Sequence, residues 1–137
     1  METTTIRLTD SHDSKWIKEL FRKRWGGEFI ITRGIIHRPE DLTGFLAEVG
    51  GEKVGLVTLK ISNQDLEIVS LDSLREKQGI ATRLVEKIKE LAKEHNLTRV
   101  FTITSNDNLD ALRFWQKRNF RLVRIYKDAF EITRKLK

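Results

Sequence analysis

The clearest repeating pattern of apolar and polar positions lies within Gln78–His95. Apolar residues recur there every three or four positions, as at Ile80, Leu84 and Ile88, with lysine and glutamate between them. This spacing places the apolar side chains along one face of an amphipathic helix. The nearly continuous apolar and β-branched run that follows, Arg99–Thr104, is typical of a buried strand beside a parallel neighbour.

Strand-like runs dominate the chain before this helix, and turn-forming residues separate them. They cover Ile6–Leu8, Gly44–Val49, Lys53–Ile61 and Asp65–Leu71. The sequence Gly-Gly-Glu joins the second and third runs, which predicts an antiparallel hairpin. The last run, the helix and the strand Arg99–Thr104 follow one another as a βαβ unit, whose crossover is expected to be right-handed.

Two further helices are predicted. The first begins among the capping residues Ser11–Ser14, carries Ile17 and Leu20 on one face, and ends at Gly26–Gly27. The second, Leu109–Arg118, follows an asparagine cap and has an aspartate in its first turn, where the helix dipole favours a negative charge.

The remaining segments are less regular. Phe29–Pro39 reads as irregular with some β character, whereas Phe120–Tyr126 and Ala129–Leu136 predict a final hairpin, with a terminal helix as the alternative for the last piece. All these elements together predict one domain, residues 1–137, of the α/β (α+β) class. We expect a mixed, mostly antiparallel central sheet of six or seven strands flanked by helices.

The composition fits a folded domain of this kind. The chain has 137 residues, 39% of them hydrophobic, and a single proline. No apolar run is long enough to span a membrane and no signal peptide is recognised, so we expect a cytoplasmic protein. Cysteine is absent, which excludes disulfides and thiolate metal sites. The three histidines lie far apart in the sequence, and no metal centre is expected.

The net charge of +6 has two interpretations. It keeps a charged surface soluble, or it attracts an anionic partner such as a phosphorylated cofactor, an acidic substrate or nucleic acid. The sequence contains no block of five or more basic residues, which argues against nucleic acid. The net charge alone does not distinguish a role in solubility from the binding of a phosphorylated cofactor or an acidic substrate.

One short segment, Gln78-Gly79-Ile80-Ala81-Thr82, opens the strongest helix directly after a strand and loop. The first N–H groups of a helix have no intrahelical partner and attract anions, and small side chains let a diphosphate approach the backbone. The glycine patterns of dinucleotide-binding and P-loop folds are missing. A helix start with small residues for close packing is the alternative.

A second pattern, Asn-x-x-Ala-x-x-Phe-Trp-x-x-x-Asn-Phe, lies one strand later, within Asn106–Phe120. Together with the glycine segment it resembles the GNAT superfamily of acyl-CoA-dependent N-acetyltransferases. The resemblance covers Glu67–Phe120 and includes the order of helices and strands. It implies acetyl-CoA as acyl donor, no metal, and transfer to a primary amine by direct attack in a ternary complex.

The resemblance also implies roles for particular residues. Contacts to the cofactor fall on Leu71, Gln78, Gly79, Ile80, Ala81, Thr82, Asn108, Phe114 and Trp115. Glu67 lies where many members carry a carboxylate that acts as general base, although strand alternation explains a single outward glutamate equally well. His37 and Asp41 are weaker candidates for the same role.

Trp115 stands where the family often has a tyrosine that protonates the leaving thiolate. Because an indole N–H is no useful acid, a non-catalytic acyl-CoA-binding or sensing domain is the alternative function. The absence of cysteine favours direct transfer over a covalent thioester intermediate. We expect a small-molecule or protein amine as partner, no nucleic acid, no membrane, and a monomer or homodimer.

Overall fold

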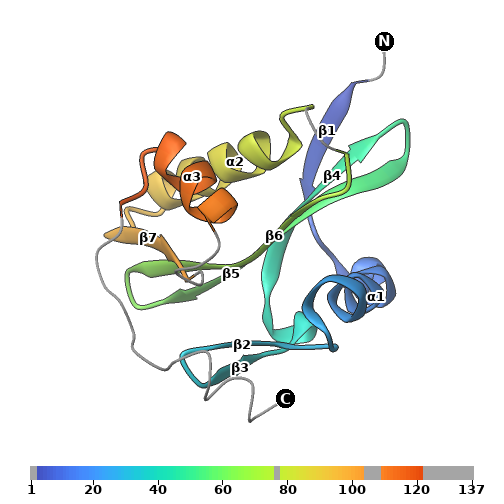
Figure 1. The fold of residues 1–137 in the computed structure, drawn as a ribbon, viewed down its shortest axis with the longest axis horizontal. Coiled ribbons are helices and arrows are strands. Elements are labelled where there is room, and N and C mark those ends of the chain that lie inside the picture. Colours follow the sequence, from blue (N-terminus) through green and yellow to red (C-terminus); the bar gives the residue numbers. More distant parts are fainter. Residues whose placement is uncertain (1–2, 76–77, 104–108, 122–137) are drawn as a thin grey trace.

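The computed structural model describes residues 3–75, 78–103 and 109–121. In this part of the chain a five-stranded central sheet has the order β1-β4-β5-β6-β7 (Figure 1). Its strands are β1 (Thr4–Leu8), β4 (Thr43–Val49), β5 (Glu52–Ser62), β6 (Asp65–Ser73) and β7 (Arg99–Thr102). The first four pair antiparallel, and β7 runs parallel to β6. The predicted mixed, mostly antiparallel class is confirmed.

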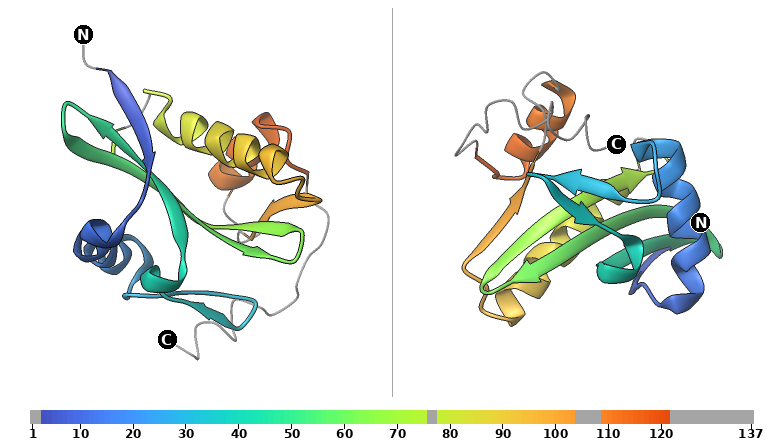
Figure 2. Two further views of the ribbon diagram at one scale, coloured as in Figure 1. Left: turned by 180° about the vertical axis from the view of Figure 1, so that it is seen from behind. Right: turned by 90° about the horizontal axis from the view of Figure 1, so that it is seen from below.

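Helices cover both faces of this sheet (Figures 1 and 2). They are α1 (Ser14–Trp25), α2 (Ile80–Glu94) and α3 (Leu109–Lys117), with single 3₁₀ turns at Ser11–Asp13 and Pro39–Asp41. A small two-stranded sheet, β2 (Ile30–Thr32) and β3 (Ile35–His37), lies on the same side as α1. In the described residues, no helix is long and apolar enough to cross a membrane.

The two faces of the sheet bury separate hydrophobic clusters. On one face, Ile80, Leu84 and Ile88 of α2 pack against strand residues that include Val57, Leu59, Leu66 and Ile68. On the other face, Ile17, Leu20 and Phe21 of α1 pack against Ile30, Leu56 and Val69. Burying each such side chain contributes about 1.5–3 kcal/mol, so both helices are held firmly on the sheet.

The first turn of α2 lies directly on β5. A Cβ atom at Gly55 would come within 2.6 Å of Ile80 Cγ2 and 3.2 Å of the Asp72 carbonyl oxygen. Only glycine therefore allows the start of α2 to lie this close to the strands. The position of the α2 N-terminus is set by that contact.

A bulge interrupts β6 in its middle. Thr58 pairs with Ser70 and Leu59 with Ile68, which leaves Val69 without a partner on β5. The pairing of β6 with β7 extends only over Asp65–Ile68, so in the described residues the two strands part where the bulge begins. Bulges often re-aim side chains beside active sites. Val69 packs in the α1 cluster, and Ser70, the residue after it, bonds to Thr58 of β5.

Most predicted elements are found close to their expected bounds, and Phe29–Pro39 proves to contain the β2–β3 hairpin. The predicted strand at Arg99–Thr104 is observed over Arg99–Thr102. The two predicted C-terminal strands lie outside the described residues from residue 122 onward. The five strands of the described sheet are therefore no test of the expected six or seven.

Candidate active site

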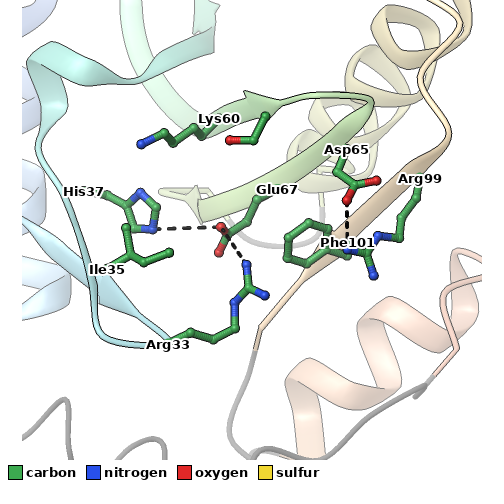
Figure 3. A pocket seen from close by; sticks show the side chains of 9 residues that line it. Arg33, Ile35, His37, Lys60, Asp65, Glu67, Arg99 and Phe101 are labelled. Atoms are coloured by element: carbon green, nitrogen blue, oxygen red, sulfur yellow. Dashed lines mark hydrogen bonds and ion pairs between the residues drawn. The ribbon is translucent and has the colours of Figure 1, made fainter.

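A pocket of about 200 Å³ lies between the β2–β3 hairpin and the strands β5, β6 and β7 (Figure 3). The hairpin contributes Arg33, Ile35 and His37, and the strands contribute residues that include Glu67 and Phe101. It adjoins the point where β6 leaves β7. The pocket thus brings together segments that are far apart in the sequence.

Glu67 lies at the centre of this pocket, although it is only 5% exposed. Its Oε2 accepts a hydrogen bond of 2.8 Å from Thr32 Oγ1. Its Oε1 lies 3.9 Å from Arg33 Nη2 and 3.9 Å from His37 Nε2. The strand alternation that directs Glu67 away from the α2 cluster directs it here into a pocket and not into solvent.

Thr32 and His37 continue the hydrogen-bond chain. His37 Nε2 lies 2.6 Å from Thr32 Oγ1, and both residues are buried. The single hydroxyl proton of Thr32 goes to Glu67, so the hydroxyl oxygen accepts from His37 Nε2–H. Nδ1 then carries the free lone pair, and it has no hydrogen-bond partner among the described residues.

Burial fixes the charge state of His37. Desolvation lowers the pKa of His37 below its ordinary value, and the positive charges of Lys60 and Arg33 lower it further, while the Glu67 carboxylate opposes the shift. A histidine with a lowered pKa is neutral at pH 7. This agrees with the hydrogen-bond chain, in which only Nε2 of His37 carries a proton.

The turn between β2 and β3 holds Arg33 in an unusual conformation. Its φ is +51° and that of the following Gly34 is +75°, as in the two-residue turns that join hairpin strands. Arginine seldom adopts a positive φ, and such strain often marks functional sites. The turn places the guanidinium 5.2 Å from the centre of the Phe101 ring and beside Glu67.

A second buried carboxylate lies further along β6. Asp72 accepts a 3.0 Å hydrogen bond from Trp25 Nε1 at the end of α1, on the same face of the sheet as Glu67. Burial raises the pKa of Asp72, an effect that the bond from Trp25 and the charge of Arg24 partly offset. The sequence carries no signal for Asp72 as a site residue, since nothing in the strand pattern marks it as buried.

The start of α2 has the properties expected of an anion site. Gly79 is the N-cap with φ +70°, and no side chain caps the helix. A Cβ atom built at Gly79 meets no heavy atom of the described residues within 4 Å, so they leave the space beside this backbone open. The N–H groups of Ile80, Ala81 and Thr82 belong to the first turn and lack intrahelical acceptors. These residues fit a diphosphate.

The neighbours of that segment differ in how accessible they are. The Ile80 side chain is buried in the core, so only its backbone faces outward, whereas Gln78 is exposed. Thr82 Oγ1 accepts a 3.1 Å hydrogen bond from Arg118 Nε, which ties the end of α3 to the start of α2. In its bonds from the Arg118 guanidinium the Thr82 hydroxyl oxygen is the acceptor and does not use its own proton.

The other residues expected at the cofactor fall in three places. Leu71 lies on the part of β6 beyond its pairing with β7, and it is half-buried. Asn108 lies outside the described residues. The rings of Phe114 and Trp115 meet edge-on at 5.0 Å, and Trp115 packs against the α2 cluster and, at 4.9 Å, against Phe120.

The two regions, the pocket and the start of α2, lie at opposite ends of β6. From Glu67 to Ser73 the strand spans about 20 Å at roughly 3.3 Å per residue. Between them runs the part of β6 beyond Ile68, which in the described residues pairs with no strand on its β7 side. In the described residues, no group of three or more histidine, aspartate or glutamate side chains is placed to hold a metal ion.

Comparisons with known proteins agree with this arrangement. An uncharacterised protein of Bacillus subtilis, YdhI, is 40% identical over 123 residues, which cover 88% of this chain and 76% of that protein. The PaiA N-acetyltransferase of Thermoplasma acidophilum in complex with coenzyme A has a TM-score of 0.74 at 16% identity, covering 91% of this chain and 94% of that one.

The aminoglycoside N-acetyltransferase AAC(6')-Iy in complex with CoA has a TM-score of 0.66 at 16% identity, covering 93% of this chain and 95% of that one. At such identities these two structures show a shared fold. Residues 8–120 match the model of the acetyltransferase (GNAT) family. The match extends over most of the chain, and the protein therefore belongs to the acetyltransferase (GNAT) family and is an acyltransferase.

Proposed function

We propose that this protein transfers an acetyl group from acetyl-CoA to a primary amine by direct attack, with Glu67 as the general base. The observation that carries the proposal is the placement of Glu67. Its carboxylate is buried in a pocket, is held by Thr32 Oγ1 at 2.8 Å, and lies where β6 and β7 part. A base must reach the proton that it removes, and a fixed carboxylate at a pocket does so.

Acetyl-CoA supplies the activated acyl group. The open backbone at Gly79–Thr82 supports binding of its diphosphate. The edge of β6 near Leu71, which no described residue pairs on the β7 side, supports contact with the pantetheine arm. Two structures of the same fold contain CoA. The diphosphate and the thioester are separated by that arm, so one bound molecule can connect the start of α2 with the pocket.

The residues of the pocket then prepare the amine. Glu67 accepts one proton from the acceptor ammonium, which frees the nitrogen lone pair for attack. The hydrogen bond from Thr32 holds the carboxylate in one orientation, and His37 holds the Thr32 hydroxyl. A positioned base typically accelerates such a reaction by about 10²–10⁴-fold. Trp115 is partly buried against the α2 cluster, and its indole N–H is no useful acid. No acid is therefore assigned to the leaving thiolate, which departs as an anion.

The test has a binding part and a turnover part. Calorimetry with acetyl-CoA should show binding, and Gly79→Asp should weaken it because the new carboxylate repels the diphosphate. Release of free CoA should then be measured with a broad panel of primary amines. The panel should include aminoglycosides, since AAC(6')-Iy acts on that class by name. Absence of acetyl-CoA binding, or of turnover with every amine, would overturn the proposal.

A further inference from the structure

The pocket around Glu67 contains more positive than negative charge. Among the residues that the structure describes, three cationic side chains line it, those of Arg33, Lys60 and Arg99, against the two carboxylates Asp65 and Glu67. Arg99 Nη2 lies 2.9 Å from Asp65 Oδ2, and Arg33 Nη2 lies 3.9 Å from Glu67 Oε1. These two ion pairs account for both carboxylates and leave one cation in excess.

The excess cation is Lys60. It is exposed and forms no ion pair with any residue in the described part of the chain. In the register of β5 and β6, Lys60 is the direct partner of Glu67. Directly opposed residues have Cβ atoms about 5 Å apart and direct their side chains to the same face. The ammonium of Lys60 and the carboxylate of Glu67 thus face one pocket as neighbours without neutralising each other.

His37 adds no further positive charge to that of Lys60. Its pKa is lowered by burial, so the imidazole is neutral at pH 7. The other lining side chains near it, Ile35 and Phe101, are apolar. When the ammonium of an acceptor binds Glu67, the surroundings therefore retain the unpaired positive charge of Lys60. A second cation on the acceptor would be repelled there, and an anion would be attracted.

The size of the pocket limits the acceptor further. Its volume of about 200 Å³ lies below the range of roughly 300–1,000 Å³ that is usual for sites of drug-sized ligands. An acceptor that reaches both Lys60 and Glu67 within this space is a small molecule with its two charged groups a few bonds apart.

From these observations we propose that the acceptor is a small amine that also carries a carboxylate or phosphate group, bound by Lys60 while Glu67 holds the ammonium. This inference rests on the proposed acetyl transfer, and it specifies the substrate class. It excludes polycationic amines as preferred acceptors.

The test compares anionic amines with partners that lack the anion. Glycine, β-alanine and 4-aminobutanoate are each assayed against their amides, and phosphoethanolamine against ethanolamine, with spermidine as the polycationic probe. We expect kcat/KM for the best anionic amine to exceed that of its uncharged partner at least tenfold. The carboxylate and phosphate series then show which anion the site prefers.

Variants of Lys60 connect this preference to the residue. Lys60→Gln should raise KM for the preferred anionic amine about tenfold and alter that of its uncharged partner far less, so that the ratio of the two kcat/KM values falls toward one. Lys60→Arg, the matched control, should keep the preference because it keeps the charge. Since Lys60 is exposed, both variants are expected to fold, which circular dichroism checks.

The outcomes separate this inference from the proposed function. Turnover that favours spermidine or the amides, or a preference that survives in Lys60→Gln, overturns the inference and leaves acetyl transfer intact. If no amine turns over, the same amines are titrated calorimetrically into the protein saturated with CoA. If an anionic amine then binds to the wild type and not to Lys60→Gln, the substrate class is supported although the proposed acetyl transfer fails. If no anionic amine binds, both the substrate class and the proposed acetyl transfer are overturned.

Discussion

At the scale of single residues, the carboxylate of Glu67 is defined by neighbours that the sequence places far away. Thr32 is 35 positions earlier in the chain, yet its hydroxyl is the closest polar contact of Glu67. The resemblance to a family identified Glu67, and strand alternation left its direction open. Only the packing of the β2–β3 hairpin against the sheet shows that Glu67 is enclosed, because alternation cannot say what covers a face.

Replacing Glu67 by glutamine tests its role as base. The amide has nearly the same shape and still accepts from Thr32, but it cannot take a proton. We expect turnover at neutral pH to fall by about 10²–10⁴-fold, with nearly unchanged affinity for acetyl-CoA, because the start of α2 lies at the far end of β6. Rates of CoA release and calorimetry measure the two effects.

The pH dependence of the Glu67→Gln defect provides a second readout. The defect should shrink as the pH rises, since more of the acceptor amine is then already deprotonated. Equal rates for the variant and the wild type at pH 7 would show that the proton leaves by another path.

Thr32 offers a test of how the carboxylate is positioned. Thr32→Val keeps the shape but removes the hydroxyl that donates to Glu67 and accepts from His37. A hydrogen bond to a charged group contributes about 1.5–3 kcal/mol, so kcat should fall about tenfold or more while KM changes little.

Thr32→Ser is the matched control, because serine retains the hydroxyl. It should keep kcat close to the wild-type value. A loss of the same size in Thr32→Ser and Thr32→Val would mean that the hydroxyl has no part in orienting Glu67.

At the scale of elements, the regular parts were predictable and the irregular ones were not. The amphipathic period of α2 and the apolar run of β7 appear directly in the sequence, and both elements are confirmed. The β2–β3 hairpin was not recognised, because its turn holds Arg33 at a positive φ, a conformation that arginine does not signal. The bulge at Val69 carries no sequence signal either, since it arises from the register between two strands.

The close packing of α2 on β5 at Gly55 predicts how a substitution there affects stability and cofactor binding. Gly55→Ala introduces a Cβ that would approach Ile80 Cγ2 to 2.6 Å, so α2 must shift. Such overpacking typically costs about 1–3 kcal/mol of unfolding free energy. Because the shift occurs in the first turn of α2, acetyl-CoA binding should weaken as well.

Gly27→Ala is a suitable control for Gly55→Ala. A Cβ at Gly27 meets no heavy atom within 4 Å, and its φ is not positive. Urea unfolding and calorimetry should show little change for this variant. If Gly55→Ala retained wild-type stability and affinity, the close contact would not determine where the α2 N-terminus lies.

At the scale of the whole molecule, the buried histidine connects the active-site pocket with global stability. Folding brings His37 from water into a site where its pKa is lowered, mainly by burial. Glu67 favours its protonated form, whereas Lys60 and Arg33 disfavour it. The neutral ring is part of the hydrogen-bond chain that joins the β2–β3 hairpin to the central sheet.

The stability of the protein should therefore depend on pH in a defined direction. Below the ordinary histidine pKa of about 6.5, the unfolded chain binds a proton at His37 that the folded chain does not. Acidification thus favours unfolding, and this contribution is fully present above that pH and lost as the pH falls toward the lowered pKa. One proton corresponds to at most about 1.4 kcal/mol of unfolding free energy per pH unit.

Urea unfolding between pH 7.5 and pH 5 measures this slope for the wild type and for His37→Asn. The variant should be less stable at pH 7.5 but lose less free energy of unfolding on acidification, because it lacks the titrating ring. His95→Asn changes an exposed histidine at the end of α2 and should keep the wild-type slope. An unchanged slope in His37→Asn would show that the His37 ring already binds its proton in the folded state at these pH values. The hydrogen-bond chain from His37 through Thr32 to Glu67 would then not depend on a neutral imidazole.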